Sequence, residues 1–166
     1  MSSRGSFAPP PPKGPPTKTL LAALPLALLL ACSGGGAAKT APLDLPKLDL
    51  KGDAPAESTL MDAIGGTGHM VAGTGLVVTV TEATDTSPKT IEEGKAEADL
   101  FSPKNIKEEK LADGWLMTFD NEGSMGKNFF VKARRDIGGK AYICDTTVSE
   151  AAQQTNAVNF CKSLKK

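Results

Sequence analysis

Residues 128–147, NFFVKARRDIGGKAYICDTT, decide the fold. Two runs rich in β-branched and aromatic residues flank Gly138-Gly139, a pair suited to the positive φ angles of a type I′ hairpin turn. A two-residue turn fixes the register of the two strands and places Ala133 opposite Cys144. The stretch therefore predicts an antiparallel hairpin whose cross-strand neighbours can be named in advance.

This register sorts the hairpin side chains onto two faces of the sheet. The more apolar face, expected to meet the core, carries Phe129, Val131, Ala133, Tyr142 and Cys144. The other face carries Phe130, Lys132, Arg134 and Asp145. Lys132 and Asp145 lie opposite each other, and we expect them to form an exposed cross-strand ion pair. Arg135 is expected to lie along Tyr142 at the end of the sheet.

Residues 149–164, SEAAQQTNAVNFCKSL, follow the hairpin and predict a terminal helix with Ser149 as its N-cap. An apolar stripe at helical spacing identifies the face expected to meet the sheet. It consists of Ala157, Val158, Cys161 and Leu164. Both Cys144 and Cys161 are therefore expected to face the same core.

Working outward, the remaining chain alternates short strands with one further helix. Residues 75–82 are the clearest strand because β-branched residues dominate them, and residues 69–72 predict a short strand before it. Ser87-Pro88 suggests the start of a helix over 88–101, and Ser102-Pro103 its end. Two more strands are expected, at residues 106–111 and 115–119.

The order of these elements predicts the fold class. Strands, a helix, a run of four strands and a final helix indicate an antiparallel sheet with segregated helices, which is the α+β class. We expect about five to seven strands and two helices. Residues 37–55 are interpreted as a linker up to about Lys47, followed by a possible edge strand.

Element order over residues 56–166 resembles that of the PsbP/Mog1-like α/β sandwich, although no diagnostic motif accompanies it. The resemblance implies a layered or sandwich-shaped domain. It also implies a protein that binds partners, because members of that fold mostly do so. A fold does not by itself fix a function.

The N-terminal segment has the features of an export signal. Residues 1–18 carry Arg4, Lys13 and Lys18 and no acidic residue, and an apolar run extends from Leu20 to Ala31. A helix of this length spans about 18 Å, whereas a bilayer core of about 30 Å needs about 20 residues. The run is therefore interpreted as the apolar region of a signal peptide over residues 1–31.

The run ends in Leu29-Leu30-Ala31-Cys32, which resembles the lipobox of bacterial lipoproteins. The resemblance implies cleavage before Cys32 and a diacylglycerol on its sulfur, so that the lipid attaches the protein to a membrane. Ser33 stands where Asp would imply retention in the inner membrane, so the outer membrane is expected. The alternative is an ordinary signal cleaved near Ala37-Ala38. With cleavage before Cys32, residues 32–55 are expected to be a flexible tether with a possible edge strand, and residues 56–166 a single domain.

Without Cys32, two cysteines remain in a chain that the signal sends out of the cytoplasm. An even number of cysteines in an exported chain favours a disulfide, here between Cys144 and Cys161. Such a bond would pin the terminal helix to the last strand. A loop of this size contributes about 3 kcal/mol in the chain-entropy model. The alternative is a pair of free thiols.

Composition argues against several functions. The chain has 19 basic and 19 acidic residues, so no basic excess exists for nucleic-acid binding. One histidine and three cysteines rule out a His-rich or Cys-rich metal cluster, and we expect no metal and no cofactor. The glycines of residues 65–75 lack the Lys-Ser/Thr of a P-loop, so a loop and a tight hairpin are expected there.

The sequence therefore predicts a non-catalytic, lipid-anchored protein of the cell envelope with a small domain that binds a protein or a small ligand. The alternative is an envelope hydrolase whose site forms only in three dimensions. His69 would be its base, beside an acidic loop residue. A cleft that brings His69 close to a carboxylate and a nucleophile would favour the enzyme. An apolar groove between sheet and helix would favour binding.

Overall fold

The computed structural model describes residues 39–123 and 126–166 of the 166-residue chain. The strands are β1 Thr40–Leu45, β2 Leu50–Pro55, β3 Thr59–Asp62, β4 Gly68–Gly73, β5 Leu76–Glu82, β6 Lys104–Leu111, β7 Gly114–Gly123, β8 Gly126–Ile137 and β9 Lys140–Val148. The helices are α1 Ile91–Ala98, followed by the 3₁₀ turn η1 Asp99–Phe101, and α2 Ala151–Ser163. None of the helices in these residues is long and apolar enough to cross a bilayer. The predicted signal peptide and Cys32 lie outside the described residues.

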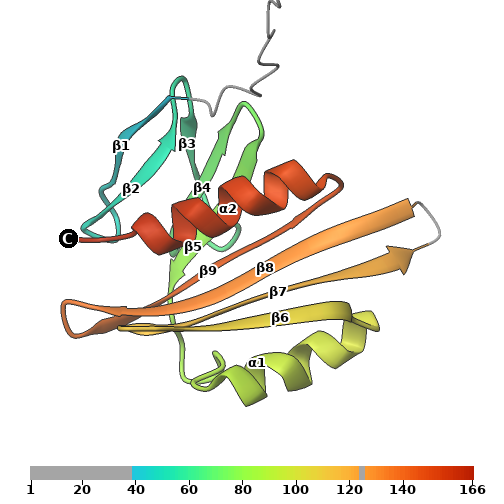
Figure 1. Cartoon of the computed structure of the whole chain (residues 1–166). Helices are drawn as coiled ribbons and strands as arrows, with labels where there is room; N and C mark the ends of the chain where they lie inside the picture. Colours follow the sequence, from blue (N-terminus) through green and yellow to red (C-terminus); the bar gives the residue numbers. More distant parts are fainter. Residues whose placement is uncertain (1–38, 124–125) are drawn as a thin grey trace, which may run out of the picture. The chain divides into compact units, whose positions relative to one another are not determined.

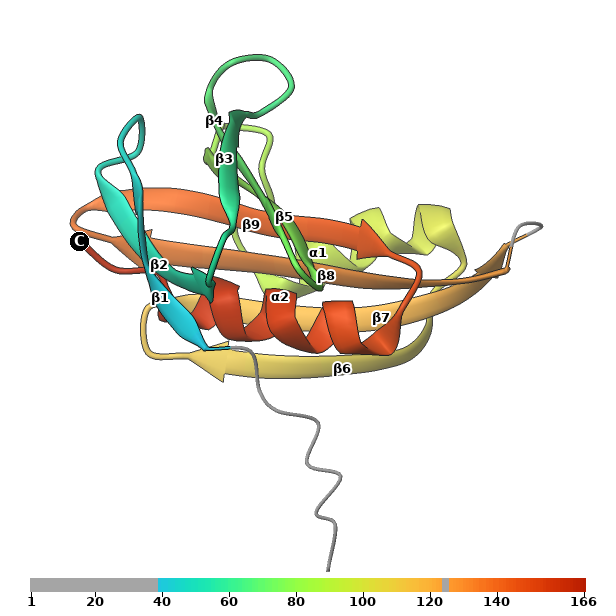
Figure 2. The same cartoon turned by 90° about the horizontal axis from the view of Figure 1, so that it is seen from above.

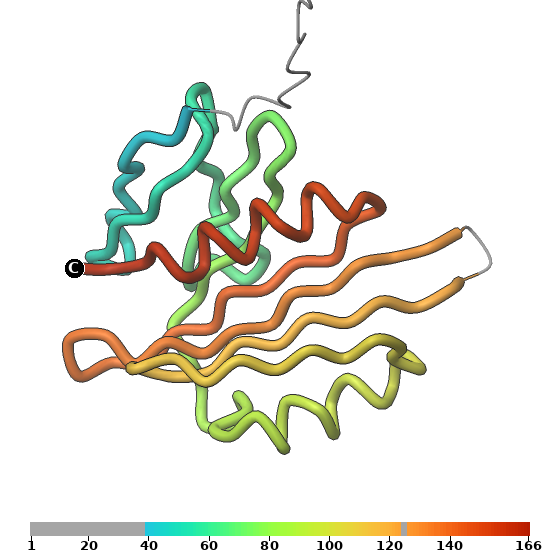
Figure 3. The backbone as a smooth tube through the Cα atoms, viewed as in Figure 1, coloured from blue at the N-terminus to red at the C-terminus, as the bar shows by residue number. Residues whose placement is uncertain are grey.

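Seven strands form one antiparallel sheet in the order β3-β4-β5-β9-β8-β7-β6 (Figure 1). The chain runs through β3, β4 and β5, crosses to the far edge through α1, and returns through β6 to β9 beside β5. Figure 3 follows this path along the backbone. The predicted α+β class with an antiparallel sheet of five to seven strands and two helices is confirmed. β3 has no counterpart among the predicted strands.

The central hairpin has the predicted register. Gly138 and Gly139 have φ angles of 59° and 81° in the turn. Ala133 lies opposite Cys144, and Lys132 lies opposite Asp145. This agreement follows from the two-residue turn, because its length leaves the strands only one way to pair.

One face of the sheet packs against α2 through the larger part of the core. Val131, Ala133 and Tyr142 contribute from the hairpin, and Ala157, Phe160, Cys161 and Leu164 from the helix side. The disulfide between Cys144 and Cys161 joins β9 to α2, with 5.7 Å between the two Cα atoms. The predicted staple of the terminal helix is therefore present. The helix begins at Ala151, one residue later than predicted, because Glu150, and not Ser149, occupies the N-cap.

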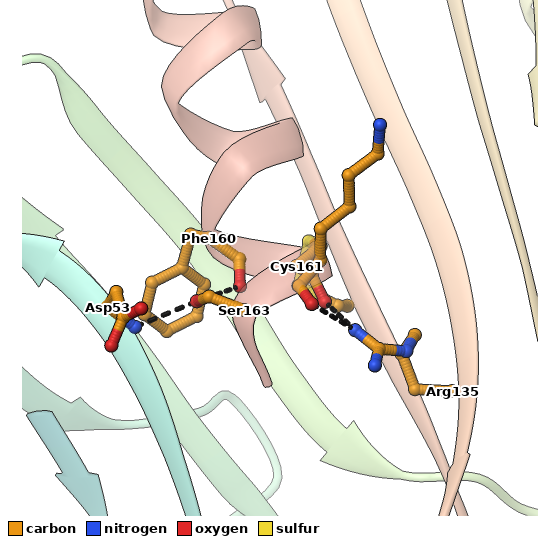
Figure 4. The surroundings of a disulfide bond; sticks show 7 residues. Asp53, Arg135, Phe160, Cys161 and Ser163 are labelled. Carbon is orange, nitrogen blue, oxygen red and sulfur yellow. Dashed lines mark hydrogen bonds between the residues drawn. A yellow bond between two sulfur atoms is a disulfide. The ribbon is translucent and has the colours of Figure 1, made fainter. Parts of the chain in front are cut away.

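Arg135 lies opposite Tyr142 in the register of β8 and β9, which agrees with its expected place, and its guanidinium also holds the C-terminal end of α2. Its Nη1 donates to the carbonyls of Cys161 and Lys162, at 2.6 and 2.8 Å, and its Nη2 donates to Leu164 at 3.2 Å. The guanidinium also forms a bidentate ion pair with Asp113. A helix ends with carbonyls that lack intrahelical partners, and this arginine satisfies three of them. Figure 4 shows the arginine beside the disulfide.

The interpretation of residues 39–47 as a linker was wrong. β1 and β2 form a two-stranded hairpin that packs on α2, and Leu45, Leu48 and Leu50 are buried in the core. Ser163 Oγ accepts a hydrogen bond of 2.7 Å from the backbone N–H of Asp53 (Figure 4). Pro46 fits because it lies in the turn between the strands, where no ladder hydrogen bond is lost. The alternation of leucine with charged residues was therefore a strand pattern from Leu43 onward.

α1 packs on the opposite face of the sheet from α2 (Figure 2). Trp115, Met117 and Phe119 alternate along β7, so they share that face, and they cluster with Phe130 and Ala98. The helix starts later than residue 88, because Thr90 is its N-cap and accepts a hydrogen bond from the backbone N–H of Glu93. It ends as predicted, before Ser102.

Candidate functional site

A groove of about 370 Å³ opens between α1 and the adjoining face of the sheet. It exists because α1 has only eight residues and covers the β7 side of that face, which leaves β9 and β5 uncovered. The volume lies at the small end of the range for small-molecule sites. It lies between sheet and helix, where the binding hypothesis expects a groove, but its lining includes polar and charged side chains as well as apolar ones.

The floor of the groove consists of two rows of side chains that cross the sheet. Strand pairing places Thr79, Asp145 and Lys132 in one row. It places Thr147, Phe130 and Phe119 in the next. All six line the groove, as do Val77 of β5 and Phe101 of η1. The Phe119 and Phe130 rings stack at 4.4 Å between centroids, so this part of the floor is a flat aromatic surface.

The wall of the groove, formed by α1, carries the charged side chain of Glu97. Glu97 of α1 binds the Lys132 ammonium, a contact that joins helix and sheet across the groove. The expected ion pair between Lys132 and Asp145 is therefore replaced by one between Lys132 and Glu97. The face is not the solvated one that the sequence suggested, because α1 packs on it and supplies a nearer carboxylate.

Asp145 is left half-buried in the floor of the groove. Desolvation raises the pKa of its carboxyl group above the ordinary value, and Lys132 opposes this while the Glu97 carboxylate adds to it. A carboxylate held in such surroundings gains from a hydrogen-bond donor or a cation placed next to it. The groove can therefore bind an apolar body and a polar or charged group at the same time.

His69, the proposed base of the enzyme alternative, lies elsewhere in the fold. It is 3% exposed on β4, and its Nε2 accepts a hydrogen bond of 3.1 Å from the backbone N–H of Lys47. Its Nδ1 has no hydrogen-bond partner within the described part of the chain. The facing residue Asp62 is paired with Lys47 at 2.7 Å. The structure thus assigns His69 to the attachment of the β1–β2 turn and does not place it in the groove.

The glycine-rich stretch 65–75 forms two hairpin connections, as expected. Gly65 and Gly66, with φ angles of 90° and 77°, belong to the loop between β3 and β4. Gly75, with a φ angle of 70°, belongs to the turn between β4 and β5. These conformations account for the glycines, and no phosphate site is needed to explain them.

The adjacent acidic pair Glu108-Glu109 diverges on strand β6, as the alternation of a strand requires. Glu108 pairs with Lys95 of α1 at 2.6 Å, and Glu109 pairs with Lys162 of α2 at 2.6 Å. Each carboxylate therefore ties this edge strand to a helix on its own side of the sheet. They do not form a carboxylate dyad.

The predicted site residues thus fall into separate parts of the molecule. Cys144 and Cys161 form the disulfide in the α2 layer, and Cys32 lies outside the described residues. The groove residues were not predicted as a site, because they converge from β5, β7, β8, β9 and α1. One signal was present in the sequence. Phe130 falls on the predicted polar face, and a large aromatic side chain there indicates that something covers this face.

Comparison with known proteins supports the fold. No protein-family model matches the chain, and no curated protein matches its sequence. Among solved structures, the chain is similar to cyanobacterial PsbP (CyanoP) from Synechocystis sp. PCC 6803, known from a solution structure. The TM-score is 0.50, the identity is 15%, and the match covers 82% of this chain and 97% of that one. The predicted resemblance to the PsbP-like fold is therefore confirmed, and at this identity it concerns the fold alone.

Proposed function

We propose that this chain is a non-catalytic, lipid-anchored protein of the cell envelope whose sandwich domain binds a ligand or a partner in the groove beside α1. The groove carries the proposal, because it combines a stacked aromatic floor with an incompletely neutralised carboxylate. Binding sites are typically concave and mostly apolar, with a few polar groups that orient the ligand. The PsbP-like fold agrees with a binding role by analogy only.

The proposed anchor is a lipid on Cys32, for which the lipobox-like sequence Leu29-Leu30-Ala31-Cys32 is the support. Cleavage before Cys32 would remove three basic residues, Arg4, Lys13 and Lys18, and no acidic one. The remaining 135 residues then have 16 basic and 19 acidic side chains, a net charge of −3 (16 − 19). Ser33 supports an outer-membrane location. Several acyl chains on one residue would hold the protein firmly, at about 0.8 kcal/mol for each buried CH₂.

Membrane fractionation of the Cys32→Ala variant tests the anchor. We expect the wild-type chain in the membrane fraction with the mass of an acylated Cys32 peptide, and the variant in the soluble fraction. Lys39→Ala is the control, because it changes an exposed residue outside the lipobox. An unchanged distribution for Cys32→Ala, with no acyl mass on the wild-type peptide, would refute the anchor.

Native mass spectrometry of the protein isolated from its own envelope tests the groove. Thr147→Arg places a long side chain on an exposed position of the groove floor, and Asn159→Arg places the same side chain on an exposed position of α2 across the sheet. We expect a bound mass on the wild type and on Asn159→Arg, and its loss from Thr147→Arg. A bound mass that survives Thr147→Arg would contradict the assignment of the groove.

A further inference from the structure

Asp145 has an unusual environment for a carboxylate. Its side chain lines the groove, yet it takes part in none of the ion pairs among residues 39–123 and 126–166, and no hydrogen bond offsets its desolvation. The nearest cation by strand register, Lys132, is bound to Glu97. Because an unpaired half-buried carboxylate is costly, a donor supplied by a ligand would be bound favourably.

The charges that face the groove are unequal in sign. The titratable residues among its lining are Glu97, Lys132 and Asp145, so the site has one more negative than positive charge when all three are ionised. The single cation already has a partner on the wall. An anionic ligand would therefore meet two carboxylates and compete with Glu97 for Lys132. A cationic ligand would meet the carboxylate that has no partner.

The rest of the lining defines the shape of the ligand. Phe119 and Phe130 are stacked, and Phe101 lies 5.4 Å from Phe130 between ring centroids. Phe101 is half-exposed and Val77 is 38% exposed, so an apolar body laid over them would remove apolar surface from water. Phe130 and Asp145 lie in adjacent rows of neighbouring strands, so both are reached by one small molecule.

From this arrangement we propose that the groove binds a small amphipathic cation, with its apolar or aromatic body on Phe130 and Phe119 and its ammonium group on Asp145. The inference rests on the proposed function, because it assigns a ligand class to the same groove. The hydroxyl groups of Thr79 and Thr147 lie in the two floor rows and are available to the remaining N–H donors. The opposite charges of Lys132 and Glu97 offset each other in their ion pair, so neither group is left to attract a second charged group of the ligand.

Isothermal titration with three probes of one shape tests this inference. The probes are 4-phenylbutylamine, 4-phenylbutanol and 4-phenylbutyrate, which share the apolar body and differ in the charge of the head group. The protein is the full chain with Cys32→Ala, so that no acyl chain competes for the aromatic floor. We expect the amine to bind, the alcohol to bind about tenfold more weakly or worse, and the carboxylate to give no measurable binding.

Two variants locate the ammonium group. Asp145→Asn keeps the shape of the side chain and removes its charge, and we expect the amine to lose its advantage over the alcohol. Asp85→Asn, on an exposed loop residue outside the groove, is the matched control and should leave all three affinities unchanged. Thr147→Arg brings a cation into the floor row beside Phe130, and should weaken binding of the amine by charge repulsion.

The outcomes separate this inference from the proposed function. Equal binding of all three probes, or an amine affinity unaffected by Asp145→Asn, would overturn the cation assignment and leave the groove as a binding site. Absence of amine binding to the wild-type groove would overturn it as well. If a mass isolated with the native protein also survives Thr147→Arg, the proposed function fails together with it.

Discussion

Lys132 and Asp145 face each other directly across β8 and β9, yet the Lys132 ammonium binds Glu97 of α1. Strand register therefore does not decide which charges pair on this face of the sheet. Helix α1 supplies the Glu97 carboxylate on a flexible side chain, and Lys132 pairs with this carboxylate instead of with Asp145. Asp145 is therefore left without an ion-pair partner in the groove.

Asp145→Asn should stabilise the protein at neutral pH. The folded state raises the pKa of Asp145 above the ordinary value of 3.8, so the folded protein binds a proton more readily than the unfolded chain does. The favourable contribution of this group is therefore complete below 3.8 and is lost as pH rises through the folded pKa. Urea unfolding at several pH values should show no gain for the variant below 3.8 and a growing gain toward neutral pH. A gain that is constant with pH would contradict the burial of the charge.

Gly94→Ala should destabilise the protein, although alanine favours a helix over glycine by about 1 kcal/mol. A Cβ at residue 94 would lie 2.7 Å from the Trp115 ring, so the helix or the ring must move. Overpacking of this kind costs about 1–3 kcal/mol. Chemical denaturation measures the change, and Trp115→Phe in the same chain should remove much of the penalty. Stabilisation by Gly94→Ala alone would show that α1 does not pack closely on Trp115.

Arg135→Met should cost about 3 kcal/mol or more of unfolding free energy. The change leaves three carbonyls at the end of α2 and the Asp113 carboxylate without their charged partner. Arg134→Met is the matched control on the neighbouring residue, whose weaker contacts with Pro88 and Asp136 predict a loss below about 1 kcal/mol. Equal losses for the two variants would argue against the capping role.

Acid should weaken the same end of α2. The hydrogen bonds from Arg135 hold the pKa of Asp113 below 3.8. The stabilisation from this group is therefore present above 3.8 and is lost as pH falls through the lower, folded pKa. The protection factors of the backbone amides in the last turn of α2, measured by hydrogen exchange, should therefore fall in that acidic range. Asp113→Asn should remove most of this pH dependence.

Replacing both cysteines of the disulfide by alanine should lower the free energy of unfolding by about 3 kcal/mol. The two residues are 17 apart in sequence, and both side chains are fully buried. Peptide mapping under non-reducing conditions should find the Cys144 and Cys161 peptides joined. Two thiols that react freely with an alkylating agent in the native protein would contradict the bond.

Local patterns in the sequence predict the parts of the fold that local physics controls. Gly138-Gly139 determines the register of β8 and β9, because a two-residue turn allows one pairing. The inward alternation of Tyr142 and Cys144 and the stripe on α2 then bring the two cysteines together. The cores on both faces follow the period of two in β7, where Leu116 and Met117 belong to opposite clusters.

The groove and the β1–β2 hairpin could not be predicted in this way. The groove depends on the length of α1 and on where the helix packs, and neither is encoded in the strands that form the floor. In residues 43–50 leucine alternates with charged residues and a proline, a pattern that an edge strand and an extended linker share. Their leucines are recognised as core only when α2 is seen to cover them. The contacts of the Arg135 guanidinium could not be predicted for the same reason, since its partners come from two distant segments, the turn at Asp113 and the end of α2.

The most direct test of the groove as a binding surface is photo-crosslinking in intact cells. A benzoylphenylalanine at Phe101, an exposed aromatic residue of the groove lining, reports on the groove, and one at Asn159 reports on α2 on the other side of the sheet. The account predicts a specific adduct from position 101, none from position 159, and loss of the adduct at position 101 when 4-phenylbutylamine is added. Adducts of equal yield at both positions, or none at position 101, would contradict it.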